Sequence, residues 1–373
     1  MKIAIITLPF NDNYGGILQG YALREYLRNR GHEVIHIEEK SKQSLVHWSQ
    51  MRFDFWWFTR RFIGEPVYRA IGKSRVIQYE QAKATRENTR KIRAFVKSNL
   101  DVKKVSNFSE IKKHGFDCIV VGSDQIWRPL YYPEIENAFL SFAESWEVKK
   151  VTYAPSFGVE NWEYNSFQTK KCKQFIKQFD ALSVREEEGV TLCKEKFNAS
   201  VKRLLDPTML LDKKDYEQLI NNNLKSKTNQ LTTYILDQSD EKRKIVAELI
   251  SKQDYTHIDL GLKSKADLGE SNDESIEFWL ENFMNAEFIL TDSFHGCVFA
   301  VLFQKPFIAF GNKERGVSRF NTLLKVFGLE DRLVFDSTNI NEIVNTTINW
   351  REVNSVLSME RHKTLRFFKG IGV

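Results

Sequence analysis

The residues with the clearest chemical potential lie in the stretch Phe288–Gly296, where a short apolar run ends in Thr-Asp-Ser-Phe-His-Gly. This pattern predicts a buried strand that leads through a turn into a helix. The first N–H groups of a helix have no partner within it, so a helix start can bind an anion. Ser293 or the aspartate before it can cap this helix, and His295 would lie in its first turn beside the anion. On spacing alone, however, a capped helix start with an incidental histidine is the more common situation.

A second group of polar residues follows the apolar run Lys2–Leu8, which reads as the first strand. The turn and helix after it contain Asn13, Gly15, Gly16 and Gln19. Glycines let a backbone approach a ligand closely, and the two amides can bind hydroxyl groups. The alternative is a turn that needs a positive φ at one of the glycines, with Asn13 as a local cap.

A third group follows the strand predicted at Asp117–Val121, which ends in Gly-Ser-Asp-Gln-Ile-Trp. Asp124 can act as a carboxylate base. Ser123, Gln125 and Trp127 can hold a sugar, with the indole stacking on its ring. A buried tryptophan beside a capping aspartate explains the same residues equally well.

Arg185 follows a predicted strand at Asp180–Val184, and its forked guanidinium suits a carboxylate or phosphate. The alternative is a surface salt bridge to Glu186–Glu188. No cluster of His, Cys and carboxylate residues has the spacing of a metal site, so we expect neither a metal nor a cofactor.

Two successive series of alternating strands and helices must position these groups. Such alternation predicts parallel sheets with ligands at the carboxyl ends of their strands. The fold class is therefore α/β, with two Rossmann-like domains facing across a cleft. We expect an N-terminal domain over residues 1–210, a C-terminal donor-binding domain over residues 231–340, and a final helix in residues 341–373 that packs back toward the first domain.

The charge of the chain is concentrated in one segment. Of the formal net charge of +6, residues 52–104 contribute +9, with 14 Lys/Arg against 5 Asp/Glu, and aromatic residues crowd their first third. We expect a helical insertion at about 45–105 that either binds anionic lipid headgroups or packs its aromatic side chains inside. The four scattered cysteines and the lack of a signal sequence or a long apolar span indicate a cytoplasmic protein.

Four pieces of the sequence, in this order, resemble motifs of the polysaccharide pyruvyl transferase family. They are Asn13-Tyr-Gly-Gly-Ile-Leu-Gln19, Val121-Gly-Ser-Asp-Gln-Ile-Trp127, Ser183-Val-Arg185 with Asp206-Pro-Thr208 behind it, and the stretch Thr291–Phe310. The resemblance covers nearly the whole chain except the insertion. It implies a fold like that of the GT-B glycosyltransferases, phosphoenolpyruvate as donor, and a pyruvate ketal on two hydroxyls of a surface-polysaccharide sugar, or of its lipid-linked precursor, as product.

The resemblance also assigns roles to residues. Arg185 would bind the donor, and His295, with Ser293 and Gly296 beside it, would bind the donor and transfer protons, with Asp124 as a second proton acceptor. Relatives often carry Arg-Leu-His where this chain has Ser-Phe-His, so a cation must come from elsewhere. The candidates for that cation are Lys305, Arg315 and Arg319. The candidates for binding the sugar acceptor are Asn13, Gly15, Gly16, Gln19, Ser123, Gln125 and Trp127.

A GT-B glycosyltransferase with a nucleotide-sugar donor is the main alternative, because a helix start serves a diphosphate equally well. A nicotinamide dehydrogenase is disfavoured, since the first loop lacks a GxGxxG pattern. We therefore predict a phosphoenolpyruvate-dependent pyruvyl transferase without a nucleic-acid partner. Its insertion leaves two alternatives open, peripheral docking at the inner membrane face and a packed structural insertion.

Overall fold

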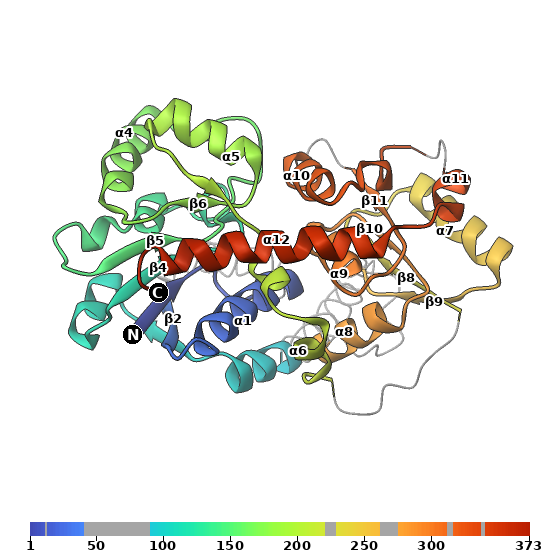
Figure 1. Cartoon of the computed structure of the whole chain (residues 1–373), viewed down its shortest axis with the longest axis horizontal. Coiled ribbons are helices and arrows are strands. Elements are labelled where there is room, and N and C mark those ends of the chain that lie inside the picture. Colours follow the sequence, from blue (N-terminus) through green and yellow to red (C-terminus); the bar gives the residue numbers. More distant parts are fainter. Residues whose placement is uncertain (12, 41–89, 221–228, 262–274, 312–315, 337–339) are drawn as a thin grey trace, which may run out of the picture.

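A computed structural model describes residues 1–11, 13–40, 90–220, 229–261, 275–311, 316–336 and 340–373. Two five-stranded sheets form its framework, and all of their strand pairs are parallel (Figure 1). The first sheet consists of β1 (Lys2–Ile6), β2 (Glu33–Glu39), β3 (Val102–Val105), β4 (Cys118–Val121) and β5 (Lys149–Thr152). The second consists of β8 (Gln230–Tyr234), β9 (Thr256–Asp259), β10 (Phe288–Thr291), β11 (Phe307–Phe310) and β12 (Leu333–Val334). A small third sheet pairs β6 (Ser183–Val184) with β7 (Lys202–Arg203).

Both large sheets change winding direction at their centre. Their strand orders are β3-β2-β1-β4-β5 and β12-β11-β10-β8-β9. The chain therefore leaves β1 toward one edge and β4 toward the other, and it does the same at β8 and β10. Such a switch point leaves a crevice at the carboxyl ends of the two central strands. The loops after β1, β4, β8 and β10 are thus placed to form a site.

The central strands are buried on both faces, which is why they read as continuous apolar runs rather than alternating ones. Every residue of β4, β10 and β11 is buried. The helices α1 (Tyr14–Arg28), α4 (Ser166–Phe175), α5 (Glu187–Leu192), α6 (Lys213–Glu217), α7 (Asp240–Gln253), α8 (Ile276–Asn285), α9 (Phe294–Leu302), α10 (Ser318–Phe327), α11 (Ile340–Asn345) and α12 (Trp350–Lys369) pack around the sheets. All residues of α9 are buried, so this helix lies inside the second domain instead of covering it.

The last helix, α12, runs across both domains (Figure 1, red). Near its start Asn354 accepts a hydrogen bond from Gln304 of the second domain. Toward its end Thr364 bonds the hydroxyl of the buried Tyr153, and Glu360 accepts a 2.7 Å hydrogen bond from Arg203. The chain therefore returns to the first domain before it ends.

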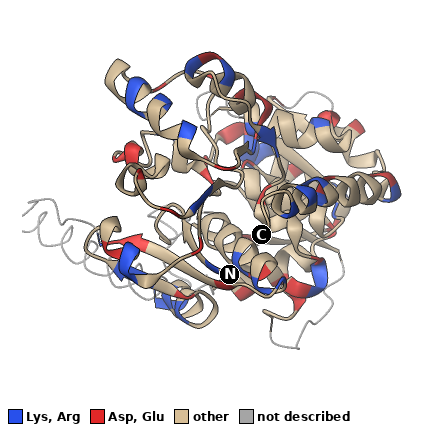
Figure 2. Cartoon of the chain, turned by 60° about the vertical axis from the view of Figure 1, so that its left-hand side comes forward, with Lys and Arg blue, Asp and Glu red and all other residues tan. Residues whose placement is uncertain are grey.

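The expected insertion at about 45–105 lies largely outside the described residues. Of its described part, residues 90–99 are helical, and Val102–Val105 is the edge strand of the first sheet, in register with β2. The last residues assigned to the insertion thus belong to the domain itself. Elsewhere positive and negative side chains are interspersed over the described helices (Figure 2). No helix in the described ranges is long and apolar enough to cross a membrane.

A buried histidine in β2 makes the stability of the first domain depend on pH. His36 is 1% exposed, its Nε2 donates to the carbonyl of Gly20, and its Nδ1 is buried without a partner. Burial lowers the pKa of His36 to about 3, although the hydrogen bond to Gly20 acts to raise it. Because the unfolded chain binds this proton at about pH 6.5, the protein should lose stability as the pH falls below that value.

We expect the free energy of unfolding to fall by up to about 1.4 kcal/mol per pH unit below pH ~6.5 on account of His36. Urea titrations at several pH values between 7.5 and 5 measure this slope. His36→Leu should flatten it, while the same change at the exposed His362 should leave it as steep as in the parent protein. Equal slopes for the parent and His36→Leu would show that another group causes the loss.

Candidate active site

A cleft of about 460 Å³ lies between the two domains, at the switch points of both sheets. The first domain contributes the loops after β1 and β4, and the second contributes the loops after β8 and β10 and the start of α10. Its polar lining residues are Asn11, Asn13, Asp124, Gln125, Asp292, Ser293, His295 and Arg319, with aromatic walls from Phe10, Tyr14, Tyr131, Tyr234, Phe294 and Phe320.

His295 lies in the first turn of α9, as the sequence predicts. Ser293 is the N-cap, and its side chain accepts the N–H of Gly296. The imidazole is 6% exposed, and its Nε2 is buried with no hydrogen-bond partner, 3.5 Å from Oδ2 of Asp206. Among the described residues, Nε2 thus makes no hydrogen bond and faces only the Asp206 carboxylate.

Gly15 of α1 makes room for that imidazole. A Cβ on Gly15 would lie 2.0 Å from Nδ1 and 2.7 Å from Cβ of His295. Neither Gly15 nor Gly16 has a positive φ, so the alternative of a glycine-dependent turn is wrong. The close approach at Gly15 is instead between the helix of one domain and the histidine of the other.

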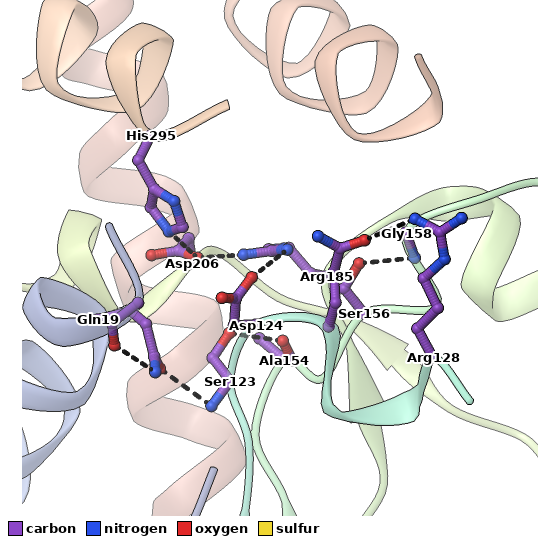
Figure 3. A network of polar contacts seen from close by, with 12 residues as sticks. Gln19, Ser123, Asp124, Arg128, Ala154, Ser156, Gly158, Arg185, Asp206 and His295 are labelled. Atoms are coloured by element: carbon purple, nitrogen blue, oxygen red, sulfur yellow. Dashed lines mark hydrogen bonds and ion pairs between the residues drawn. The ribbon is translucent and has the colours of Figure 1, made fainter. Parts of the chain in front are cut away.

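Asp206 joins groups from both domains (Figure 3). Its Oδ1 accepts the N–H and the hydroxyl of Thr208, and its Oδ2 accepts a 2.7 Å hydrogen bond from Nη1 of Arg185 and faces His295. Burial alone would raise the pKa of this carboxyl, but His295, Arg185 and Thr208 together hold it well below its usual range. Asp206 is therefore a buried carboxylate whose charge the surrounding groups need.

Arg185 is buried inside the first domain rather than paired at the surface with Glu186–Glu188. Its Nη1 bonds Asp206 and its Nη2 lies 3.3 Å from Oδ1 of Asp124. Burial would lower the pKa of this guanidinium, but the carboxylates of Asp206, Asp124 and Glu186 raise it overall. Its positive charge is thus already matched inside the protein.

For Arg319 the effects that lower the pKa outweigh those that raise it. It lines the cleft from the start of α10, and its Nε is buried without a hydrogen-bond partner. Burial and the nearby charge of Arg185 lower its pKa to about 10, more than Asp124 and Glu186 raise it. Both guanidinium groups approach the ring of Phe294, at 4.4 Å for Arg185 and 5.7 Å for Arg319. Among the described residues, Arg319 therefore has less countercharge around it than Arg185 has.

Asp124 adopts an unusual backbone conformation, with φ 58° and ψ −168°. Such values are rare outside glycine and persist only where the surroundings impose them. Here Ser156 donates its N–H to the Asp124 carbonyl at 2.7 Å, and Arg185 bonds the carboxylate. The loop after β4 is thereby fixed with its carboxylate in the lining of the cleft.

Several expected acceptor residues support this loop instead of lining the cleft. Gln19 is fully buried, and it accepts the N–H of Ser123 while donating to Thr7 and to the carbonyl of Gly16. The hydroxyl of Ser123 donates to the carbonyl of Ala154 at 2.6 Å. Gln19 and Ser123 thus join α1 to the loop that carries Asp124 (Figure 3).

Two further expectations do not fit the geometry. Trp127 is fully buried, stacked on Phe139 at 4.7 Å, and its Nε1 donates to the carbonyl of Ala138, so it presents no face to a sugar. Lys305 precedes β11 and therefore lies at the amino edge of the sheet, away from the cleft at its carboxyl edge. Arg315 lies outside the described residues.

Asn13, Gly16 and Gln125 do line the cleft with Asp124, Ser293, His295 and Arg319. Asn13 also caps α1 by accepting the N–H of Gly16. In the sequence, we read Asp206 only as part of a motif and a turn, although an aspartate beside Pro-Thr can close such a turn from a buried position. The aromatic walls gave no sequence signal, because their residues lie far apart in the chain.

Metal ligands do not gather in this part of the protein. Nowhere in the described ranges do three or more His, Cys, Asp or Glu side chains form a group that could hold a metal ion. The polar groups of the cleft instead comprise a helix start, guanidinium groups, an imidazole and carboxylates, which suits an anionic ligand and proton transfer.

Residues 13–314 match the family model described as polysaccharide pyruvyl transferase. The chain belongs to the polysaccharide pyruvyl transferase family. The match includes every strand from β2 to β11, and the family description identifies its members as transferases. No curated protein matches this family member in sequence.

Solved structures extend the comparison to the fold. S. aureus MnaA with UDP is 12% identical, with a TM-score of 0.51 over 99% of this chain and 96% of that one. UDP-GlcNAc 2-epimerase from Neisseria meningitidis bound to UDP-GlcNAc is 11% identical, with a TM-score of 0.48 over 98% of this chain and 100% of that one. The predicted fold class of this pyruvyl transferase family member, two Rossmann-like domains facing across a cleft as in GT-B enzymes, is confirmed.

Removing the charge of Asp206 should destabilise the protein, because Arg185 would remain buried with one carboxylate fewer. We expect Asp206→Asn to lower the free energy of unfolding by about 3–5 kcal/mol. Asp240→Asn, at a carboxylate that is 90% exposed, is the matched control and should change it by less than about 0.5 kcal/mol. Urea unfolding at pH 7 measures both, and a similar small effect for the two variants would contradict the role given to Asp206.

Gly15→Ala should force α1 and His295 apart and cost about 1–3 kcal/mol. Gly16→Ala is the control, since its Cβ would meet only the side chain of Asn13, at 3.2 Å or more. In a His295→Gly background the imidazole and its Cβ are both gone, so Gly15→Ala should become neutral or stabilising. A double-mutant cycle by urea unfolding tests this, and an equal cost in both backgrounds would place the strain elsewhere.

Proposed function

We propose that this protein transfers the pyruvyl group of phosphoenolpyruvate to two hydroxyls of a sugar in a surface polysaccharide or its lipid-linked precursor. Family membership supports pyruvyl transfer in general. The observation that carries the donor assignment is that His295, at the start of α9, and Arg319 line the same cleft. Among the described residues, Arg319 has less countercharge around it than Arg185 has.

The phosphate of the donor would bind between the two domains. The start of α9 and Arg319 suit its phosphate, because N–H groups and a guanidinium both donate to phosphate oxygens. Arg319 would thereby replace the arginine missing before Phe294. Arg185 is already paired with Asp124 and Asp206, so its part is to hold these carboxylates and to add positive potential behind the ring of Phe294.

The reaction needs one proton donor that also accepts a proton. The CH₂ carbon of phosphoenolpyruvate gains a proton from the His295 imidazolium, which leaves a cationic centre at C2. The first sugar hydroxyl attacks C2 and returns its proton to His295. The second hydroxyl displaces phosphate, which leaves with the second proton, and the ketal closes. Asp206 would stabilise the imidazolium from 3.5 Å, and Asp124 is the second carboxylate that can accept a hydroxyl proton.

A nucleotide-sugar donor receives less support from the cleft. A diphosphate is larger than one phosphate, and besides the start of α9 the backbone N–H groups at the end of β8 are a second place where it could bind. Those of Leu236 and Asp237 already donate to the carboxylate of Asp292, at 2.6 and 2.9 Å, and Lys242 also binds that carboxylate. The anion-binding groups near β8 are thus occupied by the protein itself, which favours a smaller anion at α9.

The acceptor would enter beside Asn13, Gly16 and Gln125, whose polar groups suit hydroxyls. A lipid-linked acceptor accords with a cytoplasmic enzyme that docks at the inner membrane face through its aromatic and basic insertion. Deletion of residues 45–89 is expected to abolish binding to anionic liposomes, and unchanged binding in a flotation assay would reject this docking.

Isothermal titration with phosphoenolpyruvate and with UDP-sugars tests the donor. We expect phosphoenolpyruvate to bind, and Arg319→Gln to weaken binding at least about tenfold through the loss of a charged hydrogen bond. Arg243→Gln, at an arginine whose side chain is 60% exposed, is the matched control and should bind as the parent does. If UDP-sugars bind and phosphoenolpyruvate does not, the glycosyltransferase alternative is favoured.

His295→Gln tests the proton transfer separately. It keeps a polar side chain at the helix start, so we expect phosphoenolpyruvate to bind within a few-fold of the parent affinity. Phosphate release from phosphoenolpyruvate with a panel of sugar acceptors should fall by at least about a hundredfold. Release at a near-parent rate would remove His295 from the chemistry.

A further inference from the structure

An exposed aromatic residue stands at the cleft where the sequence had suggested Trp127. Tyr131 lines the cleft and is 48% exposed, and its neighbour Leu130 is 66% exposed. Large hydrophobic side chains are exposed at only a few places in the described part of the chain, and these two form an adjacent pair. The ring of Tyr131 thus gives a mainly polar cleft an exposed apolar surface.

The ring of Tyr131 is held in place from one side. The guanidinium carbon of Arg128 lies 5.0 Å from the ring centroid, within the range of a cation–π contact. Arg128 is itself buried and fixed, since its Nε and Nη2 donate to the carboxylate of Glu163 at 3.0 and 2.9 Å. Its Nη1 also donates to Gln125. The ring therefore rests on a fixed support, so a ligand would meet it without a large ordering cost.

The surroundings of the ring connect it to the proposed donor site. Tyr131 lines the same cleft as Arg319. Asn11, Asn13 and Gln125 line the same cleft and can bond hydroxyl groups. One aromatic surface is thus combined with a polar edge and with the cation proposed to hold phosphoenolpyruvate.

We propose that Tyr131 is the platform on which the acceptor sugar lies. A pyranose ring has an apolar C–H face and a hydroxyl edge, and an aromatic ring packs against the first while leaving the second free. On Tyr131 the hydroxyl edge would point toward Asn13, Gln125 and the donor. The assignment rests on the proposed function for the identity of the acceptor, and it makes Tyr131 a determinant of acceptor binding.

Saturation-transfer NMR tests the platform without any donor. The probes are the methyl glycosides of galactose, glucose, mannose and N-acetylglucosamine. We expect at least one to bind the parent protein, with the strongest transfer to the protons of its apolar face. Tyr131→Phe should retain this binding, whereas Tyr131→Ala should weaken it at least about fivefold. Phe167→Ala, at an aromatic residue of α4 that is 62% exposed, is the matched control.

Phosphoenolpyruvate titrations of the same variants separate the two proposals. Donor binding within about twofold of the parent in Tyr131→Phe and Tyr131→Ala, together with lost sugar binding in Tyr131→Ala alone, supports the platform. If the parent protein does not bind phosphoenolpyruvate but its sugar binding depends on Tyr131, the platform proposal stands and the donor assignment is rejected. Equal sugar binding by the parent and Tyr131→Ala, or no binding of any probe to the parent, overturns the platform.

Discussion

One buried carboxylate holds the two halves of the site together. Asp206 lies just before the short turn that carries Thr208, and the same oxygen faces Arg185 of the first domain and His295 of the second. A carboxylate without water is stable only among such partners, so its ionisation and the closeness of the domains depend on each other. The cleft is complete only when α9 and the first domain are close together.

Of the two arginines near this carboxylate, one holds the structure together and the other is placed to bind an anion. Arg185 is enclosed by Asp206 and Asp124, and it positions them. Arg319 meets the same aromatic ring of Phe294, but burial and the nearby Arg185 lower its pKa, and among the described residues it has less countercharge than Arg185. An anion that enters the cleft would relieve this imbalance without breaking an existing pair. Binding energy would then go to the ligand and not to rearranging the protein.

The sequence predicted the elements of this site better than its contacts. The capped start of α9, the strands before each loop and the two-domain class follow from local patterns. The burial of Trp127 depends on Phe139 and Phe157, which no periodicity connects to it. The contact of Gly15 with His295 joins residues from opposite domains. The edge strand β3 contains two exposed lysines, so its sequence does not have the apolar pattern of a strand. Long-range packing decided each of these cases.

The returning helix α12 limits how the cleft can open. It is a single rod of 20 residues, about 30 Å long, seated on the second domain through Asn354 and on the first through Thr364. If the two sheets moved straight apart, α12 would lose its contacts with one of the two domains. Rotation about the rod would keep both halves seated. We therefore expect the domains to move by rotation about α12 rather than by straight separation.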